Sequence, residues 1–126
     1  MYRSAYKPIF EELNQRLARE GVYVGKSADY PRVEVHTIVE NQPTDKGDSV
    51  RVLSCVLESM STTSMEEAAT MNGDNLEVLD AFRYEDEQFR VVGVVFTGMN
   101  EMTETSDTQM ILYRVIQNAD IYVQQL

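Results

Sequence analysis

Histidine and cysteine, which supply many catalytic and metal sites, are almost missing from this 126-residue chain: it has one of each, and no tryptophan. Cys55 cannot form an intrachain disulfide, and its apolar neighbours predict a buried, unreactive thiol, which suits a reducing compartment. His36 lies within a predicted strand, so any histidine-dependent catalytic or zinc site depends on this residue alone. A plain surface histidine is the commoner role there. We therefore predict no catalytic residue, no metal ligand and no cofactor.

Other sequence signatures of chemistry are also missing. Glu85, Asp86 and Glu87 follow a predicted helix and precede a predicted strand, where charged side chains ordinarily solvate a turn. No segment has the oxygen-donor pattern of a calcium loop, and no lysine has the spacing of a phosphate-binding loop. We predict that the protein is not an enzyme.

Basic residues are few and scattered. Eleven Lys and Arg against 21 Asp and Glu give a formal net charge of -10. Nucleic-acid binding by counterion release requires clustered cations, so direct DNA or RNA recognition is disfavoured. Solubility alone explains the acidity as well as a specific functional role does.

Long apolar runs are absent as well. No stretch approaches the roughly 18 to 20 apolar residues that span a bilayer, and the N-terminus lacks the pattern of a signal peptide. We expect a protein that is made and used in cytoplasm without a membrane anchor.

The chain does contain enough apolar sequence for one core. Its hydrophobic content of 43% and charged content of 25% are ordinary for a folded domain. The length fits one domain of about 100 to 150 residues, which we place at residues 1–126.

Two segments have helical periodicity. The first, residues 4–20, repeats apolar side chains such as Leu13 and Leu17 on one face, and the following Gly21 can adopt the left-handed conformation that ends a helix. The second is residues 64–83.

This second segment begins with the pattern of a capping box. The side chains of Ser64 and Glu67 are predicted to accept hydrogen bonds from each other's backbone N–H groups. Gly73 within the segment costs about 1 kcal/mol relative to alanine, so a bend or break is expected near residues 72–74.

Alternating or continuous apolar sequence predicts the strands. Residues 32–40 alternate, with Val33, Val35 and Val39 on the buried face. Residues 50–60 have apolar side chains at both odd and even positions, which is typical of a central strand covered on both sides. Further strands are predicted at residues 22–24, 89–97, 109–116 and 120–124, the last as a short strand or a continuation past a bulge.

The order of helix, strands, helix, strands has no βαβ alternation and no internal repeat. This order favours an α+β fold: a mostly antiparallel twisted sheet with two main helices packed on one face.

Two polar segments are candidates for contacts with other chains. Residues 41–49 predict an exposed loop, and residues 98–108 predict a projecting hairpin arm or loop. Some of the seven methionines can also serve an adaptable interface, although Met more often fills core gaps. The candidate interface residues are Asn41, Thr44, Asp45, Lys46, Asp48, Met99, Asn100, Glu101, Met102, Glu104 and Asp107.

Several segments together carry a family resemblance. They are "REGVYVG" at the end of the first helix, "YPRVEVHTI", "VRVLSCVLES", the helix "SMEEAATMNGDNLEVLDAF", and the closing "FRVVGVVFTG" and "MILYRVIQNADIYVQ". In this pattern the chain resembles, over nearly its whole length, the tail terminator or tail-completion proteins of long-tailed bacteriophages. It departs from their commonest forms in lacking tryptophan and in its polar residues 100–107.

The resemblance implies a structural virion protein of the tail or neck, assembled in the host cytoplasm. Copies are expected to form a closed ring, a hexamer, that stops growth of the tail tube and joins it to the head. The implied partners are the chain itself, the tail-tube protein and a head-side neck or connector protein. DNA would pass through the lumen without specific binding, and acidic groups facing that lumen would repel its phosphates.

Other classes stay open. A small-ligand-binding α+β domain would enclose an apolar pocket lined by Met, Phe and Tyr, and would be a monomer or dimer. A hydrolase or isomerase would require a buried carboxyl group with a raised pKa in a cleft. Another neck or tail-tube subunit is a neighbouring structural role.

Overall fold

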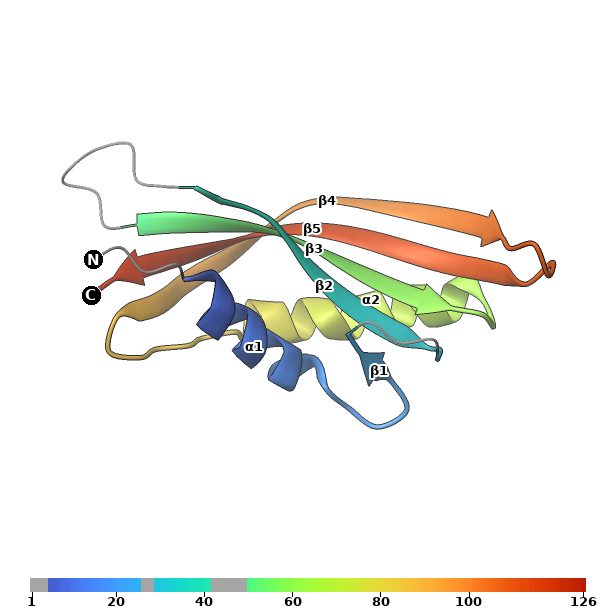
Figure 1. Cartoon of the computed structure of the whole chain (residues 1–126), viewed down its shortest axis with the longest axis horizontal. Helices are drawn as coiled ribbons and strands as arrows, with labels where there is room; N and C mark the ends of the chain where they lie inside the picture. The colour runs from blue at the N-terminus through green and yellow to red at the C-terminus, as the bar shows by residue number, and fades with distance from the viewer. Residues whose placement is uncertain (1–4, 26–28, 42–49) are drawn as a thin grey trace.

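The computed structural model describes residues 5–25, 29–41 and 50–126, which form two helices and five strands. The elements are α1 (Tyr6–Leu17), β1 (Tyr23–Val24), β2 (Arg32–Asn41), β3 (Val50–Ser61), α2 (Met65–Asp80), β4 (Phe89–Thr105) and β5 (Ile111–Gln125). The strands make one sheet in the order β1-β2-β3-β5-β4, and both helices lie on the same side of it (Figure 1). The predicted α+β class is confirmed.

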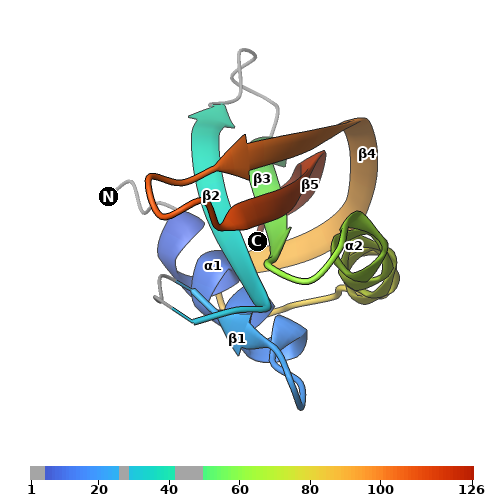
Figure 2. The same ribbon diagram turned by 90° about the vertical axis from the view of Figure 1, so that its right-hand side faces the viewer.

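The sheet is antiparallel except where β1 pairs with β2 in parallel. β3 and β5 are its central strands, while β4 forms one edge and β1 with β2 forms the other. Viewed end-on, the sheet is strongly twisted, and β4 curves past α2 (Figure 2). The β4–β5 hairpin turn lies at the opposite end from the C-terminus (Figure 1).

The core lies between the two helices and one face of the sheet. Leu13 of α1 and Leu79 of α2 pack with Leu57 of β3 and Ile121 of β5, and each side chain is at most 1% exposed. Burying a leucine side chain contributes about 1.5–3 kcal/mol, so this layer holds the helices on the sheet. The apolar stripe predicted for the first helix is confirmed.

Both helices differ from their predicted bounds. α1 ends at Leu17 because Ala18 is already extended, with ψ 129°, and Gly21 (φ +80°) instead serves the turn into β1. α2 continues through Gly73, so the predicted bend or break is wrong. Met71 and Asn75 are buried on either side of this glycine, and their packing outweighs its low helix propensity.

The predicted capping box is half correct. The hydroxyl of Ser64 accepts from the N–H of Glu67 at 3.0 Å, as expected. The Glu67 carboxylate, however, accepts from the hydroxyl of Ser61 at 2.7 Å, and the Ser61 oxygen accepts from the N–H groups of Thr63 and Ser64.

The face assignments of β2 and β3 also need correction. Val33 and Val35 are buried, but Val39 is 44% exposed because an irregularity in register between Thr37 and Val39 reverses the alternation. β3 has one buried face and one half-buried face. The prediction that both faces of β3 are covered is wrong, since both helices pack on the same side.

The last two strands are longer than predicted. β5 is one unbroken strand, and the register irregularities lie in β4, between Val91 and Gly93 and between Phe96 and Gly98. β4 continues to Thr105, so the hairpin-arm alternative for residues 98–108 is confirmed.

Candidate functional site

The predicted interface residues of the second polar segment lie together on the β4–β5 hairpin. All six are exposed; they are Met99, Asn100, Glu101, Met102, Glu104 and Asp107. In the first segment, Asn41 ends β2, whereas Thr44, Asp45, Lys46 and Asp48 lie outside the described residues. The structure therefore brings the arm residues together, and their role in an interface stays a prediction.

The outer edge of β4 carries several exposed apolar side chains. β4 is an edge strand; Glu85 bridges to Arg90 at its start, and no named strand among residues 5–25, 29–41 and 50–126 pairs with its outer side. Five large apolar side chains along it are between 38% and 54% exposed: Val92, Val95, Phe96, Met99 and Met102. We call these residues the β4 apolar edge.

Apolar side chains flank this edge on both faces of the sheet. Phe96 is the register partner of Ala119, which packs in the core, so Phe96 lies on the helix side. Val95 pairs with Asp120 and lies on the opposite side. Residues 91–100 include no charged side chain, although a quarter of the chain is charged. Unpaired edges of this kind can accept a strand from another chain.

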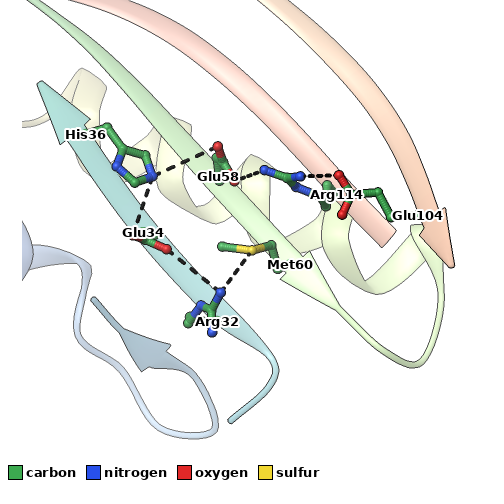
Figure 3. A network of polar contacts seen from close by, with 7 residues as sticks. All are labelled: Arg32, Glu34, His36, Glu58, Met60, Glu104 and Arg114. Carbon is green, nitrogen blue, oxygen red and sulfur yellow. Dashed lines mark hydrogen bonds and ion pairs between the residues drawn. The ribbon is translucent and has the colours of Figure 1, made fainter. Parts of the chain in front are cut away.

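Six charged or ionisable side chains form a ladder across the sheet face that points away from the helices (Figure 3). At its centre, Arg114 of β5 contacts Glu58 of β3 and Glu104 of β4, each at 2.5 Å. The full set, which we call the charge ladder, is Arg32, Glu34, His36, Glu58, Arg114 and Glu104.

The ladder compensates two carboxylates that face each other. Glu34 and Glu58 are direct cross-strand partners with side chains only 12% and 15% exposed, an arrangement that repulsion disfavours. Arg114 neutralises Glu58, Arg32 lies 3.8 Å from Glu34, and Nε2 of His36 lies 3.5 and 3.9 Å from the two carboxylates. The two arginines therefore flank the pair on both sides.

Arg114 is held in its charged form by these contacts. The hydrogen bond to Glu58 raises the pKa of Arg114 above its ordinary value, burial opposes this rise, and Glu104 adds to it. The guanidinium consequently ties the outer arm of β4 to the centre of the sheet.

A buried arginine fastens the other end of the sheet. Arg51 is 3% exposed, lies 3.5 Å from the Glu40 carboxylate and stacks over the Phe89 ring at 5.2 Å. The same Glu40 carboxylate accepts from the backbone N–H of Ala5 at 3.0 Å, at the start of α1. A negative group is favourable there because it faces the positive end of the helix dipole.

A pocket of about 550 Å³ opens between α1 and the β1–β2 edge. Phe10, Val24 and Val35 contribute apolar surface, and the Tyr6 ring stacks on Phe10 with 5.3 Å between centroids. Asn14, Glu34 and His36 complete its lining. We call this the α1–β2 pocket; it differs from the predicted ligand pocket because it lies at the sheet edge and has no Met in its lining.

The described residues assemble no recognisable reaction centre. Cys55 is 3% exposed on the helix side, whereas His36 pairs with Val56 and points to the opposite face, so thiol and imidazole do not meet. Within residues 5–25, 29–41 and 50–126, no group of three or more His, Cys, Asp or Glu is placed to hold a metal ion. The helices described are also too short or too polar to cross a membrane.

No family model matches the chain, and no curated protein matches it. Among solved structures, the fold is similar to that of a virion chain. That chain belongs to the structure described as "Virion of native gene transfer agent (GTA) particle". The two share 13% sequence identity with a TM-score of 0.65, and the match covers 92% of this chain and 91% of the other. At this identity the likeness establishes the shared fold.

The sequence predicted the arm, whereas the β4 apolar edge, the charge ladder and the α1–β2 pocket were not predicted. The uncharged run of residues 91–100 was a usable signal for the edge. The ladder and the pocket had no local signal, because their members come from separate elements brought together by the sheet register.

Proposed function

We propose that this chain is a structural subunit of a virion, located in the tail or neck. The observation that carries the proposal is a fold shared, over nearly the full length of both chains, with a chain of a gene transfer agent virion. The order of sequence segments, which resembles tail terminators, supports the same conclusion independently.

The finer role that we propose is that of a tail terminator. Copies form a closed ring, a hexamer, that ends the tail tube and joins it to a head-side neck or connector protein. A ring requires heterologous contacts, in which two different surfaces of each copy meet. The β4 edge and the β1–β2 edge are two such surfaces, at opposite ends of the strand order. No chemical step is needed for this role.

Genomic DNA passes through the lumen in this proposal without specific binding. Exposed carboxylates of the arm, including Glu101 and Asp107, would repel phosphates if the arm faces the lumen. A ring structure with a neutral or basic lumen would refute this part.

Removal of the gene from its phage or prophage tests the role directly. Electron microscopy of the lysate should show filled heads separated from tails of uncontrolled length, and expression of the chain in trans should restore joined particles of uniform length. Normal virions without the gene would refute the proposal. Capping of purified tail tubes by the added chain is the matching experiment in vitro.

A small-ligand-binding domain is the second candidate, favoured by one observation, the α1–β2 pocket. Its volume of about 550 Å³ falls within the roughly 300–1,000 Å³ of ligand pockets. This function predicts a monomer or dimer whose thermal stability rises with a bound small molecule.

A further inference from the structure

We propose that the α1–β2 pocket of one copy receives the β4 apolar edge of a neighbouring copy, with the Phe96 ring as the anchor. This contact rests on the proposed ring assembly and identifies the two surfaces that make it.

Beside the pocket lies a strand edge whose pairing among the described residues ends at Gly25. β1 pairs with β2 only up to Val24 and Val33, and the last bond runs from the Gly25 N–H to the Val33 carbonyl at 2.8 Å. Backbone groups alternate in direction along a strand, so the N–H and C=O of Val35 point to the same side as those of Val33. No described residue pairs with Val35 on that side.

The pocket also fits an aromatic side chain. Phe10, Val24 and Val35 offer apolar surface, and Tyr6 adds a second aromatic ring. Asn14 also lines the pocket, and its side-chain oxygen is buried without a hydrogen-bond partner among the described residues. Aromatic anchors in desolvated pockets with satisfied polar groups are typical centres of protein interfaces.

A second copy is the occupant we propose, and unpaired charge does not oppose it at the surfaces that meet. A chain of net charge -10 repels itself unless the surfaces that meet are free of unpaired charge. The β4 apolar edge lies in the uncharged run of residues 91–100, apart from Met102 beyond it. Among the residues that line the pocket, Glu34 already has the guanidinium of Arg32 beside it.

Topology makes this contact intermolecular. β4 and β1 are the two ends of the strand order, with three strands between them. When the edge of one copy binds the pocket of the next, the first copy keeps a free pocket and the second keeps a free edge. Further copies can therefore add until a ring closes.

Two variants and a control test the contact by multi-angle light scattering and sedimentation. Phe96→Glu places a charge at the edge, Asn14→Trp fills the pocket, and Ile111→Glu places the same charge on a 41% exposed residue outside both surfaces. We expect Phe96→Glu and Asn14→Trp each to raise the dissociation constant of self-association at least about 30-fold, the size of effect seen when an interface hot spot is lost. Ile111→Glu should assemble like the wild type. Circular dichroism checks folding, and Met99→Glu, at a 54% exposed residue, replaces Phe96→Glu if that variant is unfolded.

Mixing the two variants gives the decisive result. One intact edge and one intact pocket remain, so the mixture should form a heterodimer and stop there. A wild type that stays monomeric up to about 1 mM, or variants that still form rings, would overturn the inference. Rings that depend on these residues but fail to cap tail tubes would instead refute the terminator role and leave the contact intact.

Discussion

The charge ladder makes a quantitative prediction about stability. In Glu58→Gln, Arg114 loses its contact with the less exposed of its two carboxylates, since the Glu58 side chain is 15% exposed and that of Glu104 is 47% exposed. Hydrogen bonds to charged groups contribute about 1.5–3 kcal/mol, whereas exposed ion pairs contribute about 0–1 kcal/mol. The change also removes repulsion between Glu58 and Glu34, a gain of about 0.2–1 kcal/mol.

The attraction to Arg114 outweighs the repulsion because Glu34 has its own cation, Arg32. We therefore expect Glu58→Gln to lower the free energy of unfolding by about 1–2 kcal/mol, and Glu104→Gln by less than about 1 kcal/mol. Urea unfolding followed by circular dichroism measures both values. A double-mutant cycle with Arg114→Met isolates the coupling, and raising NaCl from about 0.1 to 1 M should shrink the Glu104 coupling more than the Glu58 coupling.

The pH dependence has a definite sign. Since the folded-state pKa of Arg114 is raised, its contribution is fully present below the unfolded-state pKa and is lost only as pH rises through the folded-state pKa, in strongly alkaline solution. The difference between wild type and Glu58→Gln should thus be constant between about pH 7 and pH 10. Equal costs for the two glutamate substitutions, or a coupling that disappears in this range, would refute the proposed arrangement.

Three further predictions concern the scaffold. Ser64→Ala should lower the free energy of unfolding by about 1 kcal/mol through loss of the helix cap, while the exposed Thr62→Ala should have little effect in the same urea titration. Phe82→Ala, at a fully buried ring, should cost about 3–5 kcal/mol, and a loss under 1 kcal/mol in thermal or urea unfolding would contradict the assigned core. Cys55 should react with a thiol reagent only after unfolding, and rapid labelling of the folded chain would show that the helix layer does not cover it.

Some features of the protein followed from the sequence because their causes are local. The stripe through Leu13 and Leu17 specified a helix face, and the spacing of Ser64 and Glu67 specified where α2 begins. Alternation in residues 32–35 placed Val33 and Val35 inside.

Other features depended on contacts between distant residues. The irregularity in β2 turned Val39 outward, and packing of both helices on one face left the other face of β3 half-buried. Gly73 stayed helical because its neighbours are buried against the sheet, which outweighs intrinsic propensity. No short stretch of sequence determines any of these outcomes by itself.

The candidate site shows the same division. The sequence by itself determined a polar, exposed arm and a run of uncharged residues beside it, because exposure and charge are properties of each segment. Only the tertiary structure decided that β4 is an edge strand, that Arg114 lies between Glu58 and Glu104, and that a pocket opens beside β2. Strand order and register set these features, and they arise from the packing of the whole chain.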